Sequence, residues 1–106
     1  MKIKENKSLF LQHFGDTPQL RVMDFFIENH FFDYPITEIA RGSNVSYNSL
    51  EFLHSWIKSG VVIKTRKVGK SDYFKLNINH PFVNQLLKMD WALVKSNILE
   101  QLEVLE

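Results

Sequence analysis

Basic side chains gather in one stretch of the chain, between Lys58 and Lys75, where six basic residues face a single acid, Asp72. Phosphate groups are bound by such local positive charge, whatever the net charge of the chain, which is only +1 here. The candidate phosphate-binding residues are Lys64, Arg66, Lys67 and Lys70. The alternative interpretation is an edge hairpin that its lysines protect from aggregation. From Lys88 to Glu106 the chain has four acids and two bases, so charge is unevenly distributed.

A second group of side chains has the types that contact the edges of bases and phosphate oxygens. Its members are Tyr47, Asn48, Ser49, Glu51, Phe52 and Ser55. The amide of Asn48 suits paired hydrogen bonds to adenine, and the hydroxyls of Tyr47 and Ser49 suit phosphate. Glu51 suits a cytosine amino group, whereas Phe52 either touches a thymine methyl or packs under the neighbouring hairpin. The alternative is a set of ordinary solvated residues beside a helix cap.

Residues of the kinds that catalyse reactions or bind metals form no recognisable motif. Cysteine is absent, so the chain has no disulfide, zinc ribbon or thiol nucleophile. The four histidines, His13, His30, His54 and His80, show no helical i, i+4 pairing. There is no Gly-rich phosphate loop, nucleophile elbow or paired-carboxylate motif. We expect no catalysis, no metal and no cofactor.

The length of 106 residues suits one domain with at most one appended element. Apolar residues make up 44% of the chain, which is enough to build a core. No apolar run reaches the length of a membrane span, and the first residues lack the apolar part of a signal peptide. We therefore expect a soluble, non-secreted, cytoplasmic protein.

A helix is predicted to begin after Thr17 and to end near Asn29. Thr17 is a favourable N-cap, and Pro18 fits the first helical position. The apolar stripe predicted for this helix comprises Leu20, Val22, Met23, Phe26 and Ile27. Its predicted polar face carries Arg21, Asp24 and Glu28. The residues before it, 1–13, are expected to form an arm or a short helix.

The middle of the chain predicts two more helices followed by a β-hairpin. A short helix around Thr37 to Arg41 is broken at Gly42-Ser43-Asn44, where Asn44 suits the left-handed conformation. Ser46 is the expected N-cap of the next helix, and Gly60 is its expected C-terminal cap. The expected strands are 61–66 and 71–76, joined by a turn over 67–70 that places Arg66 and Lys67 near the tip.

Pro81 opens the last predicted helix, which carries one long apolar stripe. The stripe comprises Leu87, Trp91, Val94, Ile98, Leu102 and Leu105. A helix of about 37 Å overhangs a body of roughly 80 residues, so a monomer would leave part of the stripe in water. A symmetric dimer is the preferred interpretation over core packing or a membrane surface, because the polar face of the helix is too acidic for anionic lipid.

The order of helix, short helix, tight turn, helix and hairpin resembles that of the winged helix-turn-helix regulators of archaea and bacteria. The residues that carry the resemblance are Ile39-Ala40, Val45-Ser46, Leu50, Ile57 and Gly60-Val61-Val62. The segment 14–26 also looks like the first helix of small archaeal regulators, and the resemblance covers about residues 14–77. It implies a third helix in the major groove of DNA and a hairpin, the wing, on the backbone or minor groove. The chain departs from many relatives at Ser43-Asn44, where they have Leu-Gly.

Together these patterns predict a mainly α fold with a small β-hairpin (α+β). The expected organisation is an N-terminal arm or short helix over 1–13, a winged helix-turn-helix domain over 14–79 and a dimerisation helix over 80–106. The expected function is sequence-specific binding of double-stranded DNA by a homodimeric transcription regulator, with no membrane partner and no small-molecule ligand evident. The runner-up is a winged-helix module that docks a protein of the transcription or replication machinery and buries the aromatic side chains around Phe31, Phe32 and Tyr34.

Overall fold

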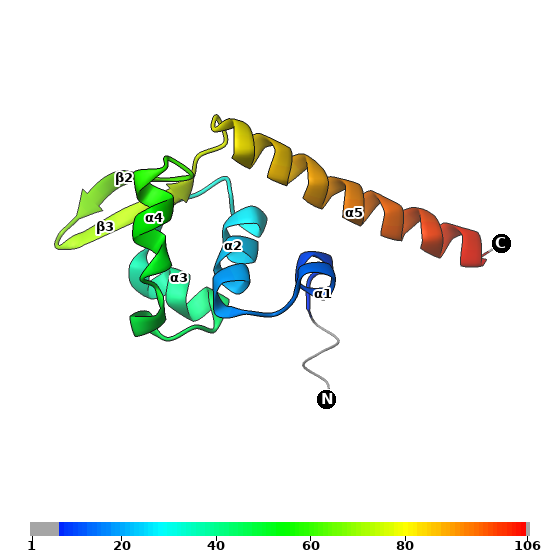
Figure 1. Cartoon of the computed structure of the whole chain (residues 1–106), viewed down its shortest axis with the longest axis horizontal. Coiled ribbons are helices and arrows are strands. Elements are labelled where there is room, and N and C mark those ends of the chain that lie inside the picture. Colours follow the sequence, from blue (N-terminus) through cyan, green and yellow to red (C-terminus); the bar gives the residue numbers. More distant parts are fainter. Residues whose placement is uncertain (1–6, 106) are drawn as a thin grey trace.

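The computed structural model describes residues 7–105, and over that range the chain is α+β, as predicted (Figure 1). The elements in chain order are α1 (Leu9–Phe14), α2 (Pro18–Glu28), β1 (Tyr34–Pro35), α3 (Ile36–Ser43), the 3-10 helix η2 (Tyr47–Ser49), α4 (Phe52–Lys58), β2 (Val62–Val68), β3 (Ser71–Leu76) and α5 (Pro81–Leu105). The residues 1–6 of the expected N-terminal arm lie outside the described range, and α1 follows them as a short helix.

Both N-terminal helices begin at side-chain caps. The Ser8 hydroxyl accepts a hydrogen bond from the backbone N–H of Leu11 at 3.1 Å, and the Thr17 hydroxyl accepts one from that of Leu20 at 3.1 Å. Pro18 occupies the first turn of α2, as predicted. Each cap satisfies a backbone donor that has no partner within its own helix.

Asp24 corrects the predicted polar face of α2, because it is buried. The helix α1 packs against α2 and α5, and it covers the face on which Asp24 lies. The Ser8 hydroxyl donates a hydrogen bond of 2.8 Å to the Asp24 carboxylate. The periodicity of α2 alone could not show that a short preceding helix would cover this face.

One hydrophobic core joins the helices to the sheet. Its most deeply buried side chains are Val22, Phe26, Ile39, Val62, Leu76 and Val83. They come from α2, α3, both long strands and the first turn of α5, which are distant in sequence. Burial of each such side chain contributes roughly 1.5–3 kcal/mol. This core fixes α3, α4 and the hairpin relative to one another.

The helix α3 runs to Ser43, two residues beyond Arg41, so it includes Gly42 and Ser43, where the sequence predicts a break. A Cβ on Gly42 would lie 2.4 Å from the Phe25 ring, so this glycine permits close packing of α3 on α2. The chain reverses at Asn44, which has the left-handed φ of 56° that the sequence predicts. The N–H of Val45 then bonds to the carbonyl of Ala40 at 3.0 Å.

The predicted single helix after Ser46 is instead divided in two. Residues Tyr47–Ser49 form η2, and the α-helix α4 begins only at Phe52. The Ser46 hydroxyl contacts that of Ser49 at 2.9 Å, in place of the expected bond to the helix backbone. The end of α4 agrees with the prediction, since Gly60 has a positive φ of 84° and the N–H of Val61 bonds to the carbonyl of Trp56.

The sheet has three antiparallel strands in the order β1-β3-β2, where the sequence predicts only a hairpin. Tyr34 and Pro35 of β1 pair with Phe74 and Tyr73 of β3. The strand β2 continues to Val68, two residues beyond the prediction, and the turn is the tight pair Gly69-Lys70. Gly69 has a φ of 63°, as a glycine at the first position of such a turn requires.

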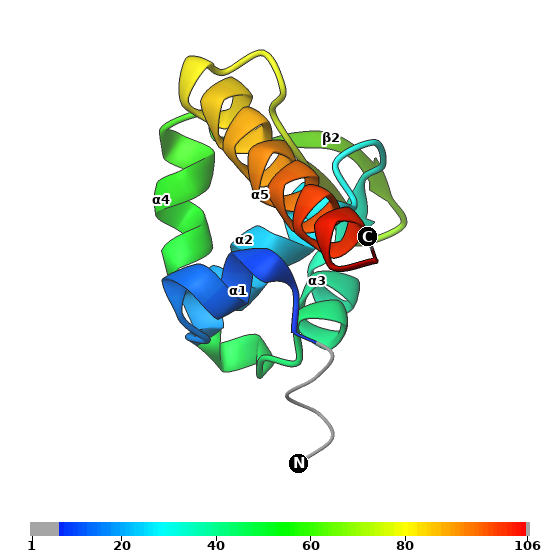
Figure 2. The same ribbon diagram turned by 90° about the vertical axis from the view of Figure 1, so that its right-hand side faces the viewer.

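The helix α5 leaves the body at Pro81 and projects past α1, so the molecule is elongated at 54 × 33 × 21 Å (Figures 1 and 2). Its 25 residues span about 37 Å. Val83 and Leu86 of its first turns are buried against the body, whereas Ile98 and Leu102 are 46% and 53% exposed. Among the described residues, no helix has the length and hydrophobicity needed to cross a membrane.

Candidate nucleic-acid interface

The polar side chains that the sequence predicts to contact bases and phosphates lie on one exposed segment, which comprises η2 and α4. Tyr47, Asn48 and Ser49 form η2, Glu51 occupies the N-cap position of α4, and Ser55 is the one predicted polar contact within α4 itself. All five are exposed. Because η2 has the tighter 3-10 geometry, its three side chains spread more widely around the axis than three residues of an α-helix.

Phe52 is half-buried and packs against the hydrophobic core. Its ring centroid lies 4.9 Å from that of Trp56 in the next turn of α4. These contacts favour packing over a role in base contact, but Phe52 packs on Trp56 and the core, where the sequence predicts packing under the hairpin. Because Phe52 is not exposed, the outer face of the segment that comprises η2 and α4 is predominantly polar.

The cations of β2 are partly neutralised by acids of the same hairpin. The ammonium groups of Lys64 and Lys67 each lie 3.4 Å from one carboxylate oxygen of Asp72. Both lysines remain exposed, and one acid cannot fully neutralise two cations. Exposed pairs of this kind contribute little to stability, so they do not prevent either lysine from binding a phosphate in place of Asp72.

Arg66 lies inside β2 and not at the tip, which corrects its expected position. Its Nε and Nη2 donate hydrogen bonds of 3.0 and 3.2 Å to the two oxygens of Asp33. Its guanidinium lies 4.5 Å from the centre of the Tyr73 ring. Thr65, the extra residue of a β-bulge, also donates to Asp33. The bulge thus turns two neighbouring side chains, Thr65 and Arg66, toward the same carboxylate.

Lys70 occupies the tip of the hairpin, and it shares a hollow with Tyr47 of η2. This hollow of about 240 Å³ is floored by Ile36 and Phe74. A second hollow of about 370 Å³ adjoins it along α4 and includes Asn48. Tyr47 lines both hollows, which together form one groove, so the structure brings Tyr47, Asn48 and Glu51 next to Lys70. The predicted hairpin cations Lys64, Arg66 and Lys67 line neither hollow.

Several polar residues that line this groove or bind the hairpin cations are absent from the sequence-based set, among them Ser71 and Asp72, which line the hollow beside Lys70. Thr37 in the first turn of α3 lines the hollow beside Lys70, and His54 of α4 lines the second hollow. Asp33 holds Arg66 from the loop before β1. The outward spacing of His54, three residues after Glu51, is a signal in the sequence, but nothing local links Asp33 to a residue 33 positions away.

The predicted dimer stripe on α5 is partly covered and partly exposed. Leu87 packs against the core and Val94 is half-buried, whereas Trp91 is exposed together with Ile98 and Leu102. The side chain of Leu105 lies outside the described residues. The exposed members lie where α5 extends beyond the body (Figure 1).

Two further observations bear on other kinds of site. Within residues 7–105, no group of three or more His, Cys, Asp or Glu side chains is arranged to hold a metal ion. Phe31 and Phe32, in the loop between α2 and β1, are 73% and 67% exposed.

No protein-family model, curated protein or solved structure matches the chain.

Proposed function

We propose that the chain is a winged helix-turn-helix protein that binds double-stranded DNA with sequence specificity and regulates transcription as a homodimer. The observation that carries this proposal is the groove in which the exposed η2–α4 segment meets the basic β2–β3 hairpin. One side of that groove includes Asn48, which suits base edges, and the other includes Lys70, which suits phosphates.

In the proposed complex, η2 and the start of α4 enter the major groove, which is about 12 Å wide and admits a helix. Asn48 then faces base edges and Ser49 a phosphate, and Tyr47 lies toward the backbone because it also faces the hairpin. The hairpin tip, with Lys67 and Lys70, reaches the backbone or the adjacent minor groove. Arg66 can contact a phosphate only if its ion pair with Asp33 breaks first.

The dimer is proposed on the exposed apolar stripe of α5. Soluble monomers rarely leave large contiguous apolar patches in water, and a second copy of the same helix covers such a stripe symmetrically. Two-fold symmetry would also present two η2–α4 segments to a pseudo-palindromic site.

A second candidate function is the docking of another protein through the loop between α2 and β1. The exposure of Phe31 and Phe32 favours it, since neighbouring exposed aromatic side chains are typical of protein interaction surfaces. Neither Phe31 nor Phe32 lines the groove between η2 and the hairpin, so the two candidate functions can be separated by variants.

The test is binding of the purified full-length chain to a fluorescently labelled random-sequence duplex, followed by anisotropy over a salt series. The double variant Lys67→Ala/Lys70→Ala is compared with Lys95→Ala, which removes an exposed lysine from α5. We expect wild-type affinity to fall steeply with salt, and the slope of log affinity against log salt to decrease by about 2 in the double variant. Lys95→Ala should leave the slope unchanged.

Absence of binding even at low salt, or an equal loss in Lys95→Ala, would overturn the proposal. Selection of a preferred duplex from a random pool then tests specificity. Asn48→Ala should reduce the preference of the chain for the selected duplex over random DNA by about 1–3 kcal/mol.

A further inference from the structure

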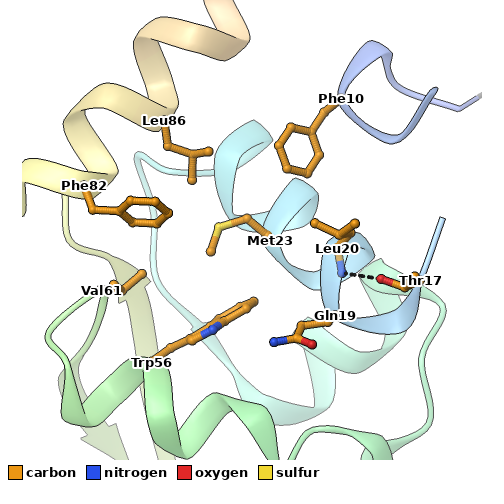
Figure 3. A pocket seen from close by; sticks show the side chains of 9 residues that line it. All are labelled: Phe10, Thr17, Gln19, Leu20, Met23, Trp56, Val61, Phe82 and Leu86. Carbon is orange, nitrogen blue, oxygen red and sulfur yellow. Dashed lines mark hydrogen bonds between the residues drawn. The ribbon is translucent and has the colours of Figure 1, made fainter. Parts of the chain in front are cut away.

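A pocket on the side of the molecule where α1, α2, α4 and α5 meet has the properties of a small-molecule site (Figure 3). Its volume is about 410 Å³, within the range of roughly 300–1,000 Å³ that is typical of ligand pockets. Its apolar walls are Phe10, Leu20, Met23, Trp56, Phe82 and Leu86, one or two from each helix. Among the described residues, only two polar ones, Thr17 and Gln19, line this pocket, whereas polar and charged side chains line much of the two hollows beside η2.

The lining determines the chemistry of a suitable occupant. No Asp, Glu, Lys, Arg or His lines this pocket within the described part of the chain, so it has no charge with which to stabilise an ion. Its polar groups are few, and the Thr17 hydroxyl is already bonded to the N–H of Leu20. The exposed side-chain amide of Gln19 lies on the same side as Trp56, where it is available to one polar group of a ligand (Figure 3).

The dimensions of the pocket favour a small molecule over a protein segment. Nine residues line it, whereas a stable protein interface uses about 20–30 residues on each side. The exposed stripe of α5 that we propose as the dimer contact includes Ile98 and Leu102, and neither of them lines the pocket. A second copy docked on that stripe therefore does not account for this hollow.

We propose that this pocket binds an uncharged, mainly apolar small molecule that carries one hydrogen-bonding group. The ligand inserts between Trp56 of α4 and Phe82 of α5, and its polar group meets the amide of Gln19. Trp56 belongs to the same helix as Ser55, so a bound ligand touches the inner side of the segment whose outer side carries the candidate DNA contacts. The site itself does not depend on DNA binding.

The test is a titration of the full-length chain, without DNA, with the neutral fluorescent probe N-phenyl-1-naphthylamine, whose emission increases in apolar surroundings. We expect saturable binding of one probe per chain. Leu20→Glu places a carboxylate at a half-exposed position in the pocket, and the probe would have to desolvate it, so affinity should fall by about ten-fold. Phe82→Ala removes an exposed wall without opening a buried cavity, and it should weaken binding by about five-fold.

The control is Phe32→Ala, which removes a more exposed aromatic side chain outside the pocket and should change affinity by less than about two-fold. Thermal unfolding establishes that each variant is folded, and if Leu20→Glu is not, Phe82→Ala decides the result. Absence of saturable binding overturns the proposal, as does an equal loss in Phe32→Ala, which would indicate general adhesion. Binding of one probe per two chains, or binding that weakens as chain concentration rises, assigns the pocket to a second copy instead.

Discussion

At the scale of single residues, the Asp33 carboxylate controls how much positive charge the hairpin presents. The hydrogen bond from Thr65, followed by those from Arg66, holds the pKa of Asp33 below its ordinary range. Because the pKa is lowered in the folded state, the carboxylate stays charged until the pH falls below its ordinary value of about 4. Arg66 therefore remains paired throughout the neutral and mildly acidic range.

The variant Asp33→Asn tests whether the pairing with Asp33 restrains Arg66 from binding phosphate. It removes one negative charge and the strong partner of Arg66, so we expect the affinity for DNA at low salt to rise by about five-fold. The salt slope measured by anisotropy should steepen by about 1, as one more phosphate contact implies. Glu100→Gln, which removes an exposed acid far along α5, is the charge-matched control. If both variants gain affinity equally, the effect is one of net charge and the restraint on Arg66 is refuted.

The buried Asp24 makes a prediction about pH and stability. Desolvation by burial is the main cause that raises its pKa, opposed by the hydrogen bond from Ser8 and reinforced by the charge of Asp90. An acid whose pKa is raised on folding destabilises the folded state as the pH rises from the unfolded value near 4 through the folded value. Asp24→Asn keeps a side-chain oxygen that accepts the hydrogen bond from Ser8, but it removes the destabilisation caused by burying a charged carboxylate.

We therefore expect Asp24→Asn to unfold at a higher urea concentration than wild type at pH 7. The difference should shrink as the pH is lowered through the folded value and vanish below the unfolded value near 4, where Asp24 becomes protonated in both states. A difference that is constant with pH would show that ionisation of Asp24 is not its cause. Ser8→Ala, by contrast, should destabilise by about 2 kcal/mol, because it removes both the cap of α1 and the partner of Asp24.

At the scale of elements, the contact between α2 and α3 depends on the missing side chain of Gly42. Gly42→Ala improves helix propensity by about 1 kcal/mol. Its Cβ, however, would meet the Phe25 ring at 2.4 Å, and overpacking of this kind costs typically 1–3 kcal/mol. We expect a net loss of about 1 kcal/mol in the free energy of unfolding, measured in urea.

A double-mutant cycle with Phe25→Leu identifies the cause of that loss. The smaller side chain at 25 makes room for the added methyl, so Gly42→Ala should become neutral or stabilising in the Phe25→Leu background. If Gly42→Ala costs the same in both backgrounds, the clash with Phe25 is not the reason for the glycine.

At the scale of the whole molecule, the overhang of α5 governs assembly. Ile98→Gln/Leu102→Gln should convert the proposed dimer to a monomer, because it makes the exposed stripe polar. Loss of the second half-site should weaken DNA binding by about 100-fold. The mass in solution is measured by analytical ultracentrifugation and the affinity by anisotropy. Unchanged mass would contradict the proposed interface.

Met89→Gln is the matched control for this pair. Met89 is also exposed on α5, but it precedes Ile98 by nine residues, about two and a half helical turns, and so lies on the opposite face. We expect it to leave both the mass and the DNA affinity unchanged. A monomer produced by Met89→Gln would place the dimer contact on the other side of the helix.

The local chemistry of the sequence determined the ends of elements and their apolar faces. Thr17-Pro18, Asn44 and Gly60 mark helix ends because cap and left-handed positions depend on one or two residues. The hairpin strands and α5 follow from β-branched residues and from helical spacing, which are equally local. The two candidate groups of DNA contacts were also found from residue types alone, and their role in binding remains a prediction.

The tertiary structure decided what each face meets. The sequence placed Asp24 in water, but α1 buries it. The sequence also predicted one helix where the structure has η2 and α4, with Leu50 and Leu53 buried at their junction. Asp33 and Arg66 meet only because β1 joins the sheet. The apolar pocket likewise needs four helices that no local pattern connects. A sequence carries periodicity and caps within a few residues, whereas contacts across 15 or 30 positions exist only once the core has closed.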